Sequence, residues 1–143
     1  MKSPFETLIQ EPRIDLKAKR VAIIGVGSVG SFVSAALASA GVGHLDLFDR
    51  DNLESANLRR HLCSTSSLGK NKATEVAQEL QQRFDGVSVE ANPGCILDDS
   101  RMLREILLNV DAFLVAVDVE GPKFLIDAMA WEIGKPGLYV GVY

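Results

Sequence analysis

The segment Val21-Ala-Ile-Ile-Gly-Val-Gly-Ser-Val-Gly30 joins a short apolar run to a G-x-G-x-x-G sequence. The run Val21–Ile24 has no polar interruption, which is typical of a strand buried on both faces. Small and apolar residues from Ser28 to Ala40 predict a helix that can lie close to a sheet. A glycine-rich turn between a strand and a helix binds phosphate groups, because the unpaired N–H groups of the first helical turn point at the anion. The segment therefore predicts a nucleotide site.

The glycines of this turn have different expected roles. Gly25 permits the tight turn, Gly27 lets a phosphate approach the backbone, and Gly30 allows the helix to pack closely. Ser28 can offer its backbone N–H to the anion. The alternative is a tight turn with a purely structural role, and the motif alone does not name the nucleotide.

Apolar runs and helical segments alternate along the rest of the chain. This order predicts an α/β fold with a doubly wound, Rossmann-like, mostly parallel sheet, in the strand order 3-2-1-4-5 and with helices on both faces. We expect an N-terminal segment over residues 1–19 and a nucleotide-binding domain over 20–143. Because the chain stops on a strand, we expect this domain to be a truncated part of a longer protein. The remaining predicted strands are 44–48, 87–91, 112–117 and 138–142, and the predicted helices are 69–84, 98–108 and 121–133.

The composition excludes several classes of protein. The 143 residues include 47% hydrophobic and 24% charged residues, which argues against disorder. A net charge of −4 argues against a nucleic-acid partner, and no apolar run has the roughly 18 residues that a membrane span needs. Cys63 and Cys95 form no C-x-x-C pair, so we expect two buried thiols in a reducing, cytoplasmic protein.

Asp49 follows the second predicted strand, about 20 residues after the glycine turn. A carboxylate in this position can accept hydrogen bonds from ribose hydroxyls. Up to this point an NAD-dependent oxidoreductase explains the pattern equally well, since Val21–Gly30 also looks like the opening of a lactate or malate dehydrogenase.

The segment after Asp49 separates these interpretations. Asp49-Arg-Asp-Asn-Leu-Glu-Ser-Ala-Asn-Leu-Arg-Arg-His61 resembles the D-x-D-x-(V/L)-x-x-x-N-L-x-R-(Q/H) signature of the ThiF/MoeB family, the ubiquitin-activating-like adenylyltransferases. Three further elements of the family have counterparts that follow in the right order along the chain. They are Ala40-Gly-Val-Gly43, Gly69-Lys-Asn-Lys72 and Ala116-Val-Asp118. A dehydrogenase needs neither the N-L-x-R pair nor this lysine.

The chain also departs from the family pattern. Ser28 stands where many members have a second glycine, His61 where many have glutamine, and Val119 where many have asparagine. The upstream segment that supplies an arginine across the dimer in many members is missing. Arg13 is a candidate substitute for that arginine.

The resemblance implies that a carboxylate attacks the α-phosphate of ATP and forms an acyl-adenylate and pyrophosphate. The carboxylate would belong to the C-terminal Gly-Gly of a ubiquitin-like or sulfur-carrier protein, and the enzyme would be a homodimer. Such a step needs positioning and charge neutralisation, with no nucleophile from the protein. We expect residues 1–143 alone to be inactive, because the residues that bind the carrier would lie further along the chain.

Three residues are the expected catalytic set. Arg60 suits a bidentate grip on phosphate oxygens, and its alternative is a solvated surface arginine. Lys72 at a helix start is locally unfavourable unless a phosphate binds nearby. Asp118 at the end of a buried strand can hold Mg²⁺ together with phosphates, and otherwise would cap the next helix.

The polar loop supplies two further expected ligands. Asn57 is expected to contact phosphate or to fix the loop, and Asp51 to orient Arg60 or lie near the metal. Two competing functions remain open: a non-catalytic adenylation-fold subunit and an NAD-dependent oxidoreductase.

Overall fold

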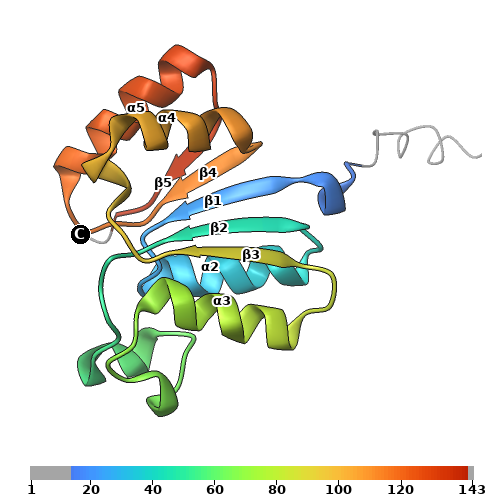
Figure 1. Cartoon of the computed structure of the whole chain (residues 1–143), viewed down its shortest axis with the longest axis vertical. Helices are drawn as coiled ribbons and strands as arrows, with labels where there is room; N and C mark the ends of the chain where they lie inside the picture. The colour runs from blue at the N-terminus through green and yellow to red at the C-terminus, as the bar shows by residue number, and fades with distance from the viewer. Residues whose placement is uncertain (1–13, 142–143) are drawn as a thin grey trace, which may run out of the picture.

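Five parallel strands form one sheet in the order β3-β2-β1-β4-β5. The computed structural model of the chain describes residues 14–141. The predicted strand order and the predicted doubly wound fold are confirmed (Figure 1). The strands are β1 (Arg20–Ile24), β2 (His44–Phe48), β3 (Ser88–Asn92), β4 (Ala112–Val115) and β5 (Gly137–Tyr139).

Two pairs of helices cover the two faces of the sheet. Helices α2 (Ser28–Ser39) and α3 (Lys72–Arg83) lie on one face, and α4 (Ser100–Asn109) and α5 (Glu120–Ile133) lie on the other (Figure 1). Four short 3₁₀ helices complete the structure: η1 (Leu16–Ala18) before β1, and η2 (Ser55–Arg60), η3 (Thr65–Ser67) and η4 (Ile96–Asp98) in connections.

The side chains of residues 21–24 of β1 are apolar on both faces of the sheet. Ile23 belongs to the core under α2 and α3, whereas Ala22 and Ile24 belong to the core under α4 and α5. This division follows from the strand geometry, because successive side chains point to opposite faces. Each face therefore has its own buried cluster, and β1 lies in the middle of both.

Several elements begin or end at other residues than predicted, and three of these differences lie at or near the carboxyl edge of the sheet. Strand β4 ends at Val115 rather than 117, and β5 covers 137–139 rather than 138–142. Ala116 still donates its N–H to Ile24, but the chain then turns towards α5 and carries Asp118 into a loop. Helix α3 begins at Lys72 rather than 69.

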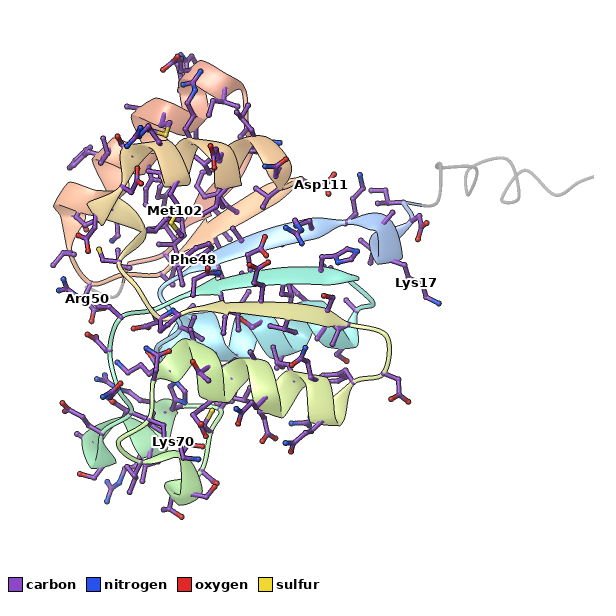
Figure 2. All side chains as sticks on the ribbon, in the orientation of Figure 1. Lys17, Phe48, Arg50, Lys70, Met102 and Asp111 are labelled. Atoms are coloured by element: carbon purple, nitrogen blue, oxygen red, sulfur yellow. The ribbon has the colours of Figure 1, made fainter. Side chains whose placement is uncertain are left out.

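The parallel arrangement brings the carboxyl ends of the strands to one edge of the sheet. Arg50, which follows β2, lies at this edge, and Lys17 and Asp111 lie at the opposite edge (Figure 2). The turns after β1, β2, β3 and β4 therefore converge, and this is where doubly wound sheets bind ligands. Within residues 14–141 no helix is long and apolar enough to cross a membrane.

Candidate functional site

A cavity of about 390 Å³ opens at the carboxyl ends of the strands. This volume lies within the range of small-molecule sites. Of the predicted site residues, all except Gly30 line the cavity: Gly25, Gly27, Ser28, Asp49, Asp51, Asn57, Arg60, Lys72 and Asp118. Residues separated by more than 90 positions in the sequence thus meet at one place, as the strand order requires.

The glycine turn has the geometry that its sequence predicts. Gly25 has φ +91°, and a β-carbon there would lie 2.7 Å from the carbonyl oxygen of Ala116. A β-carbon on Gly30 would collide with the carbonyl oxygen of Gly25. Gly27 is the N-cap of α2, and a β-carbon on it would have no heavy atom within 4 Å. Gly25 and Gly30 are therefore required by the fold, while Gly27 leaves open space beside the backbone.

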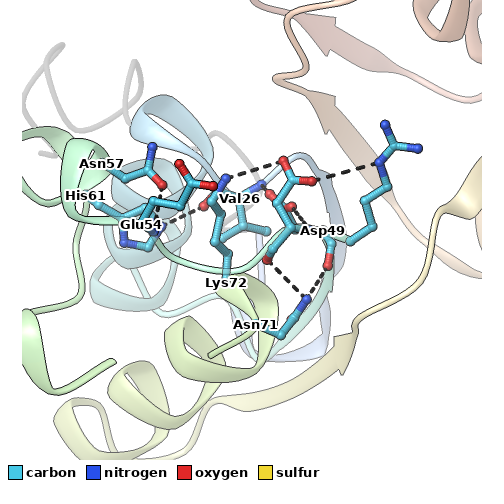
Figure 3. A network of polar contacts seen from close by, with 9 residues as sticks. Val26, Asp49, Glu54, Asn57, His61, Asn71 and Lys72 are labelled. Atoms are coloured by element: carbon cyan, nitrogen blue, oxygen red, sulfur yellow. Dashed lines mark hydrogen bonds and ion pairs between the residues drawn. The ribbon is translucent and has the colours of Figure 1, made fainter. Parts of the chain in front are cut away.

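Asp49 ties the loop after β2 to the glycine turn (Figure 3). One carboxylate oxygen accepts from the Val26 N–H at 2.8 Å, and the other accepts from the Asp51 N–H at 2.9 Å. A carboxylate has about four lone-pair sites, so both oxygens can still accept a further hydrogen bond. The role of Asp49 as a ribose ligand stays a prediction, and the structure adds a role in holding the turn.

The positive charge of Lys72 is paired with a carboxylate from the neighbouring loop. Its Nζ lies 3.4 Å from Oδ2 of Asp51, and its side chain is 12% exposed. Asp51 therefore pairs with Lys72, and among the described residues it makes no hydrogen bond or ion pair with Arg60. The largely buried side chain of Lys72 thus lies on the cavity wall, where its positive charge is close enough to interact with a bound phosphate.

Asn71 holds this corner together and was not identified from the sequence. Its side chain caps α3 by accepting from the Thr74 N–H, and it donates to the carbonyl oxygen of Asp49 at 2.8 Å (Figure 3). An asparagine directly before a helix is a strong capping signal, so the sequence contained a clue to this residue.

Asn57 fixes the loop that carries Arg60. Its Oδ1 accepts from the backbone N–H of Glu54 at 3.0 Å, and together they form the capping box of η2 (Figure 3). The guanidinium of Arg60 makes no hydrogen bond or ion pair with any residue of the described part of the chain. Arg60 is exposed and lines the cavity. Its charge is therefore available to an anionic ligand.

Asp118 lies in the loop between β4 and α5 and lines the cavity. Val119, rather than Asp118, is the N-cap of α5, and no side chain caps that helix. Over residues 14–141 no three His, Cys, Asp or Glu side chains form a metal cluster. A Mg²⁺ ion held by one carboxylate and by ligand phosphates would still fit this arrangement, because Mg²⁺ keeps most of its water.

His61 is a buried residue of the site that the sequence showed only as a departure from the family pattern. Its ring contacts the carbonyl oxygen of Val26 and the backbone N–H of Cys63. Burial lowers the pKa of His61 below its usual value.

The two thiols differ. Cys63 is buried, as predicted, and burial raises its pKa to about 11, with Glu79 and Glu75 adding to the effect. Cys95 is partly exposed and lines the cavity with the segment after β3, so its prediction as a buried residue was wrong. Residues 94–97 follow the carboxyl end of β3, which is the signal that could have placed them in the site. Arg13 lies outside the described residues.

Comparisons with known proteins agree with this geometry. A sequence model of the ThiF family matches residues 4–143. A sulfur carrier protein adenylyltransferase from Thermus thermophilus is 32% identical over 90% of this chain and 47% of its own length. The ATP-dependent ubiquitin transferase-like protein Cap2 from Enterobacter hormaechei is 28% identical over 85% of this chain and 20% of its own length. The structure of E. coli MccB with ATP is 29% identical with a TM-score of 0.75, and the match covers 89% of this chain and 38% of that chain. The chain thus spans less than half the length of these relatives.

Proposed function

The chain belongs to the ThiF family, and on that premise we propose that it supplies the ATP-binding part of an adenylyltransferase. The observation that carries the proposal is the convergence of Gly27, Arg60 and Lys72 on one cavity. An unobstructed turn backbone and two cations are the groups that a triphosphate needs. That one relative is named a sulfur carrier protein adenylyltransferase, and that another was crystallised with ATP, supports this choice of nucleotide.

In the proposed reaction a carboxylate oxygen attacks the α-phosphorus of ATP. The bond between the α-phosphorus and the bridging oxygen breaks, and pyrophosphate leaves with that electron pair. The N–H groups of the turn and the Arg60 guanidinium would neutralise charge on the phosphate oxygens, and Lys72 would hold the leaving pyrophosphate. The contribution of the protein is positioning and charge, because no covalent intermediate with a side chain is needed.

Asp118 is the proposed magnesium ligand. Its carboxylate lines the cavity and makes no hydrogen bond or ion pair within the described range of 14–141. Bound there with the phosphates, the ion would supply charge neutralisation at the departing pyrophosphate. The role of Asp118 itself is to fix the metal-bound phosphates against the turn after β1.

The proposed substrate is the C-terminal Gly-Gly carboxylate of a ubiquitin-like or sulfur-carrier protein. Two relatives are a sulfur carrier protein adenylyltransferase and a ubiquitin transferase-like protein, which supports this class of acceptor. We also propose that residues 20–143 are one part of a larger adenylation domain, that the active form is a homodimer, and that Arg13 reaches across the dimer. These proposals rest on the family and not on a contact between described residues.

ATP–pyrophosphate exchange with a candidate carrier protein, using the longest natural form of the protein, tests the proposal. Arg60→Ala and Lys72→Ala should each lower exchange by roughly 100-fold or more, the loss typical of one charge-stabilising group. Arg59→Ala and Lys70→Ala are the matched controls, since both side chains are exposed and neither lines the cavity. Equal losses in the control variants would contradict the assignment.

A further inference from the structure

His61 joins two segments of the site that are far apart in the sequence. The residue is 6% exposed, and its Nε2 lies 2.9 Å from the carbonyl oxygen of Val26, in the middle of the glycine turn (Figure 3). On the other side of the ring, the backbone N–H of Cys63 donates to Nδ1 at 3.1 Å. A ring nitrogen that accepts carries no proton, so the neutral ring carries its proton on Nε2 and donates it to Val26.

The hydrogen bond to Val26 has a consequence for the next N–H group. The carbonyl of Val26 and the N–H of Gly27 belong to the same peptide unit, which is planar and has the two groups pointing in opposite directions. A donor that holds this carbonyl on the protein side therefore turns the Gly27 N–H away from His61. Asp49 fixes the preceding peptide through the Val26 N–H at 2.8 Å. The two side chains together determine the orientation of the turn backbone.

The charges around His61 are consistent with a neutral ring. Burial lowers the pKa of His61, while the hydrogen bond to Val26 raises it. The ammonium of Lys72 on α3 lowers the pKa, and the carboxylate of Asp49 raises it. Helix α2, whose Ser31 side chain accepts from the N–H of the residue after His61, contains no charged residue. The net effect is a lowered pKa, so the donor on Nε2 is paired with an unprotonated Nδ1 at neutral pH.

We propose that His61 is a positioning residue whose Nε2–H orients the Gly27 N–H towards the ligand phosphate and couples the turn to the loop that carries Arg60. The identity of the ligand rests on the proposed function, whereas the orientation of the turn does not. Glutamine, which many members of the family have at this position, places a side-chain N–H₂ at nearly the same reach as Nε2.

Two substitutions separate the two hydrogen bonds of the ring. His61→Gln retains a donor that reaches the Val26 carbonyl but loses the acceptor for the Cys63 N–H. His61→Asn retains an acceptor near the position of Nδ1 but is too short to reach Val26. Both variants replace the ring by a smaller amide, so both lose packing. Asparagine is also one methylene group shorter than glutamine, so His61→Leu, which fills the space without any hydrogen-bonding group, is the control for packing. A role in packing alone would leave His61→Leu closer to wild type than His61→Asn, whereas loss of the donor to Val26 would make His61→Leu resemble His61→Asn.

The first measurement needs no nucleotide. Amide hydrogen exchange at residues 25–28 should be close to wild type in His61→Gln and roughly fivefold to tenfold faster in His61→Asn, the effect of about one lost hydrogen bond. The ¹⁵N ring shifts of His61, recorded in a His44→Gln background so that a single histidine remains, should show the Nε2–H tautomer at pH 7. An Nδ1–H or doubly protonated ring, or equal exchange in the two variants, would overturn the proposal.

The second measurement is ATP affinity by calorimetry in the presence of Mg²⁺, with thermal unfolding of each variant as the control for stability. His61→Gln should bind ATP within about twofold of wild type, and His61→Asn should bind roughly fivefold to tenfold more weakly. A His61→Asn variant that binds like wild type would overturn the proposed link to phosphate binding. If the wild-type protein binds no ATP, the proposed function is wrong. Amide hydrogen exchange would still decide the role of His61.

Discussion

At the scale of single residues, the glycines of the turn differ in the space that a β-carbon would have. Gly30 has no space for a β-carbon, because the carbonyl oxygen of Gly25 occupies it, whereas Gly27 has open space beside it. We therefore expect Gly30→Ala to destabilise the fold by about 3 kcal/mol, as overpacking does. Gly27→Val should leave the free energy of unfolding nearly unchanged and abolish ATP binding, because its side chain would stand in the cavity. Urea unfolding and calorimetry check the pair, and a folded Gly27→Val variant with wild-type affinity would refute the phosphate position.

The two thiols offer a second test at this scale. Cys63 is buried and its pKa is raised to about 11, so its thiolate is scarce at neutral pH. Cys95 is partly exposed on the cavity wall. A thiol reagent applied to the folded protein at pH 7.5 should label Cys95 and leave Cys63 intact, with both labelled in urea. Peptide mass mapping reads out the sites, and rapid labelling of Cys63 in the folded state would contradict the described packing.

His61 also makes the stability depend on pH. Its pKa is lowered in the folded protein, so the unfolded chain takes up the proton first as the pH falls below about 6.5. The contribution of the neutral ring is complete above that pH and declines below it. Asp46 acts with the opposite sign, because burial raises its pKa and the folded state binds its proton more readily. Urea unfolding at pH 7.5 and 5.5 should show a smaller loss in the free energy of unfolding for His61→Gln than for wild type. Equal losses in wild type and His61→Gln would refute this assignment.

Helix α3 shows how one element supports the site. Its N-cap Asn71 closes the helix and also donates to the carbonyl oxygens of Asp49 and Asp51. Asn71→Ala should therefore destabilise the protein by about 2 kcal/mol, at the upper end for a lost cap. Asn71→Asp retains the cap acceptor and loses the donor to the loop. Because it loses the hydrogen bonds to the carbonyl oxygens of Asp49 and Asp51, Asn71→Asp should bind ATP more weakly than wild type. Its helical circular dichroism should be unchanged, since the cap remains. Wild-type ATP affinity in Asn71→Asp would show that Asn71 only caps the helix.

The regular elements could be predicted because their signals are local. The unbroken apolar run of β1 and the glycine turn identify the fold, and the resemblance adds Arg60, Lys72 and Asp118. The contacts between loops could not be predicted in the same way. That Asp51 pairs with Lys72, and that His61 reaches Val26, depends on the path of residues 50–71 across the sheet edge. The partial exposure of Cys95 could not be predicted for a similar reason, because it depends on how η4 packs.

At the scale of the whole molecule, exposed apolar side chains lie on α5 and on the edge strand β5. Phe124 and Trp131 are 72% and 88% exposed, and Leu138 on the edge strand is also exposed. Exposed apolar patches and bare edge strands favour association. We expect residues 1–143 to self-associate in light scattering, and Trp131→Arg to reduce the association without lowering the melting temperature. A monomer at high concentration would contradict this expectation, and robust adenylation by that monomer would contradict the proposal that the domain is incomplete.

The central claim is that the carboxyl edge of the sheet binds ATP through the turn after β1 and the cations of the adjoining loops. The most direct measurement is a titration of ¹⁵N-labelled residues 1–143 with Mg·ATP and, separately, with NAD⁺, followed by backbone amide shifts. We expect ATP to shift the amides of Gly27, Arg60, Lys72 and Asp118. NAD⁺ at the same concentration should have much smaller effects, and Gly27→Val should remove the response to ATP. Stronger shifts with NAD⁺, or ATP shifts that map to another face of the sheet, would contradict the claim.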